Sequence, residues 1–320
     1  MKKRTAIISL FLCLLFSIDV SAAMPQQVVA VGKAVGIDVQ CSGLMVVGFA
    51  EDSPARDGGL HQGDIIIKVD GQLVDAPAQL RALLQDKSQV TLTALRRQQE
   101  QSFLVRPQLQ DGQALIGANV RSEMAGIGTI TYYDPATAVF GALGHGITEG
   151  SSSKLFPVHQ GFLCSATVAR VDKGEAGSPG MLQGAFDSNH ILGLITKNTP
   201  CGIFGQLTIV PQGETVVVGA RDQVHTGPAE ILCNVEGEQV AHYTVKITRL
   251  FPLDDNTGRN LMLEVTDPAL LQRTGGIVQG MSGSPILQDG KLIGAVTHVL
   301  VSDPTTGYGI FIDNMLKAAA

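Results

Sequence analysis

Two serines, Ser282 and Ser284, stand two residues apart in the glycine-rich stretch at residues 275–299, GGIVQGMSGSPILQDGKLIGAVTHV. A serine hydroxyl is a weak nucleophile until a base takes its proton, and N–H groups must then stabilise the developing oxyanion. Gly280 lets the chain bend so that its own N–H and that of Ser282 point together, and Gly283 leaves room for a substrate. The spacing favours Ser282 as a nucleophile and Ser284 as a small structural residue.

A general base must accompany such a serine, and the chain has seven histidines. His145 ends the apolar segment VFGALGH and is the first candidate. His298, in the apolar segment GAVTHVL directly after the serine turn, competes with it. Polar surroundings instead indicate surface positions for four others, His159, His190, His225 and His242.

Residues 28–107 resemble a PDZ domain, carried by the ordered match SPARDGGLHQGDIIIKVDGQLV at residues 53–74. Gly63 and Asp64 turn the chain into a buried strand, Asp70 and Gly71 suit a tight hairpin turn, and residues 76–85 show helical spacing. The resemblance implies a peptide-binding groove beside that helix, with backbone N–H groups that capture a peptide carboxylate. The residues expected to line it are Val35, Gly36, Ile37, Asp38 and Leu80. A PDZ fold used only for packing, with Leu80 in its core, is the alternative.

Residues 111–320 contain many short β-like segments, which predict a barrel or a sandwich. Residues 267–273 are the one helical candidate, with Asp267 placed as an N-cap and Pro268 at the first helical position. The segment at residues 177–183, GSPGMLQ, parallels GSPILQ at residues 283–288. A duplicated barrel or chance similarity in a glycine-rich chain explains the parallel.

The turn GMSGSP resembles the nucleophile turn of chymotrypsin-like serine peptidases, and GALGH resembles the turn that carries their general base. This resemblance implies a mainly β fold, with the PDZ domain followed by a chymotrypsin-like double β-barrel peptidase domain at residues 111–320. It places the oxyanion hole at the N–H groups of Gly280 and Ser282.

Longer segments are similar to one family, the PDZ-containing serine peptidases called stage IV sporulation protein B. They are GALGH, PCGIFG, GPAEIL, VTDPALLQRTGGIVQGMSGSPI and GAVTHVLVSDPTTGYGIFID. The similarity implies His145 as base, Ser282 as nucleophile and Asp267 as the acidic residue. Asp267 precedes Ser282 by only 15 residues, whereas a chymotrypsin-like orienting aspartate lies much earlier. A purely capping role for Asp267, with Asp172 or Asp187 orienting the base, stays open.

The family resemblance also implies a biological role. Its members are exported into the space between the two forespore membranes and cleave themselves. They then cut the extracytoplasmic part of a membrane-bound regulator of an intramembrane protease, which activates a pro-sigma factor during sporulation. The implied partners are a protein substrate and the chain itself, with no cofactor and no metal.

The N-terminus predicts export. The basic start KKR, an apolar run at residues 6–18 and the small residues VSAA are typical of a signal peptide at residues 1–23, cleaved or kept as an anchor. In an oxidising compartment Cys41, Cys164, Cys201 and Cys233 could form up to two disulfides or stay as buried thiols. The net charge of -6 gives no electrostatic reason to expect nucleic acid.

Two other functions fit parts of the sequence. A catalytically silent PDZ scaffold would keep the serine turn for packing alone. A general quality-control protease of the HtrA kind would share both domain types, but those enzymes place their PDZ domains after the protease.

Overall fold

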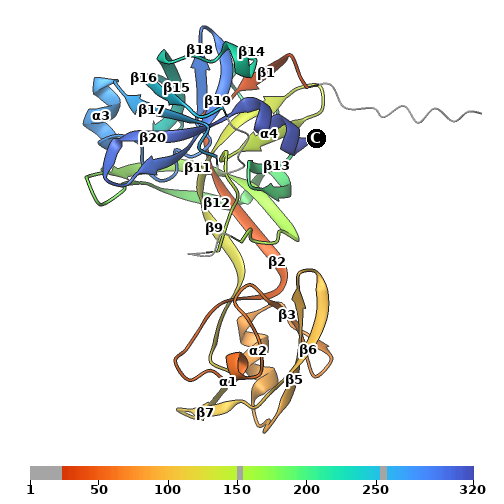
Figure 1. Ribbon diagram of the computed structural model, residues 1–320. Helices are drawn as coiled ribbons and strands as arrows, with labels where there is room; N and C mark the ends of the chain where they lie inside the picture. Colours follow the sequence, from red (N-terminus) through yellow and green to blue (C-terminus); the bar gives the residue numbers. More distant parts are fainter. Residues whose placement is uncertain (1–23, 150–153, 253–257) are drawn as a thin grey trace, which may run out of the picture.

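The computed structural model describes residues 24–149, 154–252 and 258–320, so the predicted signal peptide or anchor at residues 1–23 lies outside the described residues. The chain forms a PDZ body and a pair of β-barrels (Figure 1). In the described part of the chain, no helix is long and apolar enough to cross a bilayer.

The PDZ body has its own hydrophobic core, which runs from Leu44 to Ile116. Ser53 caps the first helix by accepting a hydrogen bond from the N–H of Arg56. The expected tight turn is present, with positive φ at Asp70 and Gly71. The elements are α1 (Pro54–Asp57), β3 (Ile65–Val69), β4 (Gln72–Leu73), α2 (Pro77–Leu84), β5 (Val90–Arg96), β6 (Gln99–Val105), β7 (Gln108–Gln110) and β8 (Gln113–Leu115).

Six strands close the first barrel around a core of its own. They are β2 (Ala34–Phe49), β9 (Ala118–Asp134), β10 (Val139–Ala142), β11 (Gln160–Asp172), β12 (Met181–Thr199) and β13 (Gly202–Leu207). The first strand pairs with the second and the fourth, and the sixth lies between the third and the fifth.

The second barrel closes in the same order. Its strands are β15 (Gly227–Glu236), β16 (Gln239–Leu250), β17 (Leu261–Val265), β18 (Pro285–Gln288), β19 (Lys291–Leu300) and β20 (Asp303–Phe311). Two more strands, β1 (Gln27–Ala30) and β14 (Glu214–Val218), pair with each other and connect β9 to β19. The remaining elements are η1 (Arg221–Gln223), α3 (Pro268–Thr274) and α4 (Ile312–Ala319). The predicted mainly β architecture, a PDZ domain with a double barrel, is confirmed.

The two GSP segments are not equivalent in this duplicated topology. Ser178 lies exposed at the turn between the fourth and fifth strands of the first barrel. Ser284 is fully buried, directly before the fourth strand of the second. The strand order therefore supports duplication, whereas the local sequence parallel does not.

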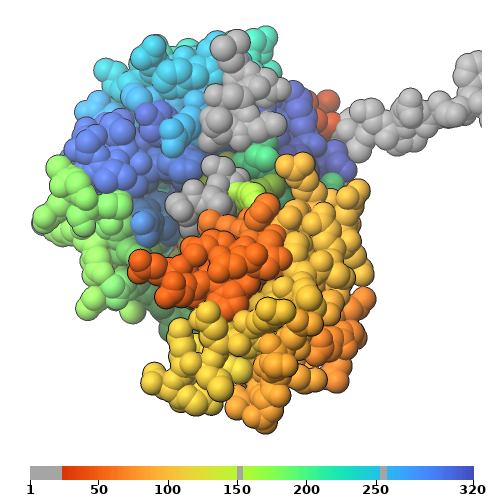
Figure 2. Space-filling model, turned by 60° about the horizontal axis from the view of Figure 1, so that its bottom comes forward, coloured from red at the N-terminus to blue at the C-terminus, as the bar shows by residue number. Residues whose placement is uncertain are grey.

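The strands β2 and β9 run side by side from the PDZ body into the first barrel (Figure 1). Their outer parts, residues 45–49 and 118–121, pair beside the PDZ sheet, and their inner parts, residues 34–40 and 123–129, pair inside the barrel. The two bodies also touch elsewhere: Gln62 Nε2 donates to Glu149 Oε2 at 3.0 Å, and Lys154 Nζ donates to the carbonyl of Gln62 at 2.9 Å. In Figure 2 the orange and yellow PDZ surface forms a lobe against the barrels.

This arrangement corrects the predicted peptide groove and the predicted start of the PDZ domain at residue 28. Both edges of the strand carrying Val35, Gly36, Ile37 and Asp38 are paired, with β9 on one side and β11 on the other. Gly36, for example, lies opposite both Ile127 and Cys164, so no free edge is left for a peptide. Leu80 is buried in the PDZ core, as in the packing alternative.

The helix predictions near residues 76–85 and 267–273 match α2 and α3. The C-terminal helix α4 was not predicted, although Ile312, Met315 and Leu316 recur at helical spacing and are buried. Cys41, Cys164 and Cys233 are free and buried, as the second of the two expectations has it, and Cys201 is buried as well.

Candidate active site

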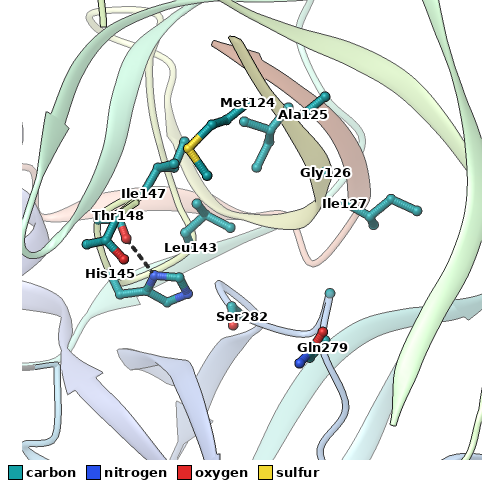
Figure 3. Close-up of a pocket in the computed structure, with 13 residues that line it drawn as sticks. Met124, Ala125, Gly126, Ile127, Leu143, His145, Ile147, Thr148, Gln279 and Ser282 are labelled. Carbon is teal, nitrogen blue, oxygen red and sulfur yellow. Dashed lines mark hydrogen bonds between the residues drawn. The ribbon is translucent and has the colours of Figure 1, made fainter. Parts of the chain in front are cut away.

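A cavity of about 320 Å³ opens where the barrels meet, and it contains both His145 and Ser282. Its floor is apolar because Ile37 and Leu143 belong to the core of the first barrel. Figure 3 shows the His145 ring and the Ser282 side chain on the same side of the cavity. The lining residues are Ile37, Met124, Ala125, Gly126, Ile127, Leu143, His145, Gly146, Ile147, Thr148, Gln279, Gly280 and Ser282.

His145 follows β10, the third strand of the first barrel, and its ring is fixed by the backbone. Nδ1 lies 3.0 Å from the carbonyl oxygen of Gly146 (Figure 3). Since a carbonyl only accepts, Nδ1 must carry the proton, and in the neutral ring Nε2 keeps its lone pair. Burial lowers the pKa of His145, which favours this neutral form. A general base needs that tautomer.

Ser282 lies in the turn before β18, and its Oγ donates a hydrogen bond to the carbonyl of Thr297 at 2.8 Å. Thr297 itself is held by a bond from its Oγ1 to the carbonyl of Gly258 at 2.5 Å. The serine hydroxyl therefore rests on β19, next to the cavity. A rotation about its Cα–Cβ bond is needed to turn it toward His145.

Two threonines of the first barrel hold the serine turn. Thr129 Oγ1 donates to the carbonyl of Gly280 at 2.8 Å, and Thr131 Oγ1 donates to the carbonyl of Gly283 at 2.7 Å. The N–H of Thr129 also donates to the carbonyl of Ser282 at 3.0 Å. Neither threonine was predicted from the sequence, because nothing local marks a partner more than 150 residues away.

The role expected for Gly283 needs correction. A Cβ at this position would lie 2.1 Å from the carbonyl oxygen of Thr129 and 2.5 Å from the N–H nitrogen of Leu143. The absent side chain thus makes room for the backbone of the first barrel rather than for a substrate. With φ at 97°, the residue also adopts a conformation that favours glycine.

The N–H groups of Gly280 and Ser282 meet the requirement for an oxyanion hole. Both residues line the cavity, and neither N–H has a hydrogen-bond acceptor among the described residues. Gly280 has φ at 98°, which allows the bend that the sequence suggested. Unsatisfied donors beside a nucleophile can bind a developing negative charge.

Asp267 does not line this cavity, and the structure shows it in the capping role that was left open as the alternative. Its Oδ1 accepts the N–H groups of Ala269 and Leu270, at 2.9 and 3.0 Å, so it caps α3. Its Oδ2 lies 3.4 Å from the N–H nitrogen of Thr244. Oδ1 thus satisfies N–H groups at the start of the helix, and Oδ2 faces a donor of β16.

The alternative carboxylates do not reach His145 either. Asp172 pairs with Arg170 and with the side-chain amide of Gln183, and Asp187 accepts the N–H of Asn189. In the described part of the chain, no carboxylate forms a hydrogen bond or ion pair with His145.

His298, the competing base, packs against His145 with 5.0 Å between the ring centroids. It does not line the cavity, and its Nδ1 is buried without a hydrogen-bond partner among the described residues. Burial, together with the charges of His145 and Arg259, lowers the pKa of His298 to about 4. Its placement favours His145 as the base. No group of three His, Cys, Asp or Glu side chains within the described residues could hold a metal ion.

Residues 112–316 match the family model of the SpoIVB peptidase S55, well over half of the chain. The chain belongs to the SpoIVB peptidase S55 family. Residues 45–96 match a PDZ domain model, so this S55 serine peptidase carries a PDZ domain. The matched part of the peptidase includes His145 and Ser282.

The three solved structures described next are at most 24% identical in sequence to this chain. The PDZ domain of an SdrC-like protein of Listeria innocua is 24% identical, covering 25% of this chain and 93% of that one, at a TM-score of 0.23. The Rv3671c protease from M. tuberculosis, in its active form, is 13% identical. The match covers 62% of this chain and 75% of that one, at a TM-score of 0.35. The HtrA-type protease AlgW with a decapeptide is 10% identical. The match covers 91% of this chain and 64% of that one, also at a TM-score of 0.35. A comparison with curated protein sequences gives no match.

Proposed function

We propose that this peptidase is an exported serine endopeptidase, with Ser282 as nucleophile and His145 as general base. It cleaves itself and the extracytoplasmic part of a membrane-bound regulator of an intramembrane protease, which leads to activation of a pro-sigma factor in sporulation. The observation that carries the proposal is the shared cavity of Ser282 and His145 in a chain of the SpoIVB family.

The chemistry follows from the two side chains and the turn. His145 Nε2 takes the proton of Ser282 Oγ as the oxygen attacks the substrate carbonyl carbon. The N–H groups of Gly280 and Ser282 bind the resulting oxyanion. The imidazolium then protonates the leaving amine, and a water molecule activated by the same ring hydrolyses the acyl-enzyme. In place of a carboxylate, the carbonyl of Gly146 holds the ring.

The location and the natural substrate rest on the N-terminal sequence and on the family. The basic start, apolar run and small residues of residues 1–23 support export. A PDZ domain fused to a peptidase implies a protein substrate. Together they support a substrate domain that is exposed outside the cytoplasmic membrane.

The test is incubation of the purified chain with the ectodomain of a candidate membrane regulator. Wild type, Ser282→Ala, Ser284→Ala and Asp267→Ala are compared by the fragments that they produce, including fragments of the peptidase itself. We expect loss of both cleavages in Ser282→Ala alone. Retained cleavage in Ser282→Ala with loss in Ser284→Ala would overturn the nucleophile assignment.

A catalytically silent PDZ scaffold is the second candidate. The hydrogen bond from Ser282 Oγ to Thr297, rather than to His145, favours it. Apo active sites often hold the nucleophile loosely, and the bond tightens only with substrate. Identical fragment patterns from wild type and Ser282→Ala would support the scaffold.

A further inference from the structure

We propose that the hairpin between β11 and β12 orients the oxyanion hole. Leu182 is the positioning residue, because its backbone N–H donates to the carbonyl of Gln279. The inference rests on the proposed function. It assigns a role to the GSPGM segment at residues 177–181, which the first barrel contributes to a site in the second.

The key contact is a short parallel bridge between the hairpin and the serine turn. The N–H of Leu182 donates to the carbonyl of Gln279 at 2.8 Å, and the N–H of Gln279 donates to the carbonyl of Gly180 at 2.8 Å. These two bonds fix the orientation of the backbone directly before Gly280.

Peptide planarity transmits this orientation to the oxyanion donor. The carbonyl of Gln279 and the N–H of Gly280 belong to one peptide unit, and in a trans peptide they point in opposite directions. When Leu182 holds the carbonyl on its own side, the N–H of Gly280 must point away from Leu182. Gly280 lines the cavity with Ser282, and its N–H has no acceptor among the described residues.

Glycine by itself does not select this orientation. Gly280 can adopt φ values of either sign, so the peptide unit before it can rotate unless a neighbour holds it. A rotated unit would direct the carbonyl of Gln279 toward the cavity, where it would repel the oxyanion. A Cβ at Gly280 would lie 3.0 Å from that of Leu182, so the close approach of the hairpin leaves little room for a side chain at this position.

The hairpin is firmly attached to the second barrel, as a positioning element must be. The N–H of Gly174 donates to the carbonyl of Thr274, and the N–H of Gly177 donates to the carbonyl of Val301, both at 2.8 Å. Val168 and Leu182 are buried in the hydrophobic core of the second barrel. The hairpin therefore moves with the serine turn.

The decisive variant is Leu182→Pro in the full chain, which removes the N–H that donates to Gln279. Leu182→Ala is the matched control, because it loses the same buried side chain but keeps the N–H. The readout is the burst of p-nitrophenol from p-nitrophenyl acetate, which gives the acylation rate constant and the apparent binding constant separately. Cooperative thermal unfolding shows that each variant is folded.

We expect acylation in Leu182→Pro to be about 10²-fold to 10³-fold slower than in Leu182→Ala, with the binding constant within about threefold, as for loss of one oxyanion donor. A folded Leu182→Pro that acylates within about threefold of Leu182→Ala overturns the inference. If wild type shows no burst that depends on Ser282, the proposed function fails instead.

A second pair keeps the inference testable if Leu182→Pro does not fold. A Cβ in Gly180→Ala would lie 2.2 Å from the carbonyl oxygen of Asp172, so the hairpin tip must shift. Ser178→Ala changes an exposed side chain on the same tip. We expect at least a tenfold slower acylation in Gly180→Ala than in Ser178→Ala, and equal rates in two folded variants overturn the inference.

Discussion

The carbonyl oxygen of Gly146 lies 3.0 Å from Nδ1 of His145, where serine peptidases with a triad place a carboxylate. A carbonyl fixes the tautomer as well as an aspartate does, but it adds only a dipole to stabilise the imidazolium. The turn packed against Gly146, residues 199–202, contains no carboxylate. This relationship sets the acid–base behaviour that we expect of the site.

Cleavage should persist below the pH at which an ordinary histidine loses its basic form. Burial lowers the pKa of His145 from 6.5, and only the neutral ring can accept a proton from Ser282. The acid limb of kcat/KM should therefore have its midpoint below pH 6.5. A pH–rate profile with a midpoint at 7 or above, as a carboxylate partner would produce, contradicts the carbonyl arrangement.

Stability should fall as the pH drops from about 6.5 to about 4, because of His298. Its folded pKa is about 4 and its ordinary value is 6.5, so the unfolded chain binds the extra proton throughout this window. The difference corresponds to roughly 3 kcal/mol, lost progressively toward the acid end. The free energy of unfolding, measured by chemical denaturation at each pH, should change less steeply with pH in His298→Phe than in wild type. An unchanged slope in that variant would assign the effect to other groups.

Asp267→Ala should lower the free energy of unfolding by about 1 kcal/mol, since it removes the cap of α3. Asp267→Asn keeps a capping oxygen and loses the charge, so it should be nearly as stable as wild type. We expect kcat per folded molecule to stay within about threefold in both variants. A loss of 10²-fold or more in Asp267→Asn would restore the catalytic role.

Thr129→Val should destabilise the chain by about 0.5–1.5 kcal/mol, because it removes the side-chain donor to the half-buried carbonyl of Gly280. Thr129→Ser keeps the hydroxyl and should retain most of the activity. Thermal unfolding and kcat measured together separate the two effects. Equal activity in the valine and serine variants would show that this bond does not position the turn.

Ser284→Ala should leave stability unchanged or raise it by up to about 2 kcal/mol. The Ser284 hydroxyl is fully buried and has no hydrogen-bond partner in the part of the chain that the structure describes, so alanine removes an unsatisfied polar group. The variant should also keep its peptidase activity. Strong destabilisation in a denaturant titration would show that the hydroxyl has a partner.

The double barrel and the cavity follow from signals that are local in sequence. The segments around His145 and Ser282 each carry their own glycines, and the alternation of short apolar runs indicates strands without specifying neighbours. Tertiary pairing brought the two segments together as the chymotrypsin-like resemblance implied.

The errors arose where one local pattern is compatible with two structures. An apolar strand beginning near Val35 fits a PDZ groove or a barrel interior, and only the pairing with β9 and β11 decides. An aspartate directly before Pro268 is compatible with a helix cap and also with an acidic residue that serves the nucleophile, and the structure shows the cap. The contacts of Thr129 and Leu182 with the serine turn have no sequence signal at all, because they depend on how the barrels dock.

The course of β2 and β9 makes the PDZ body an insertion within one barrel hairpin rather than a module joined by a linker. Gln40 and Glu123 face each other as the last pair of the inner ladder. Joining them through a two-residue turn would give a continuous β-hairpin and a peptidase without its PDZ body. Truncation from the N-terminus, in contrast, would remove β1 and the first barrel strand before it reached the PDZ domain.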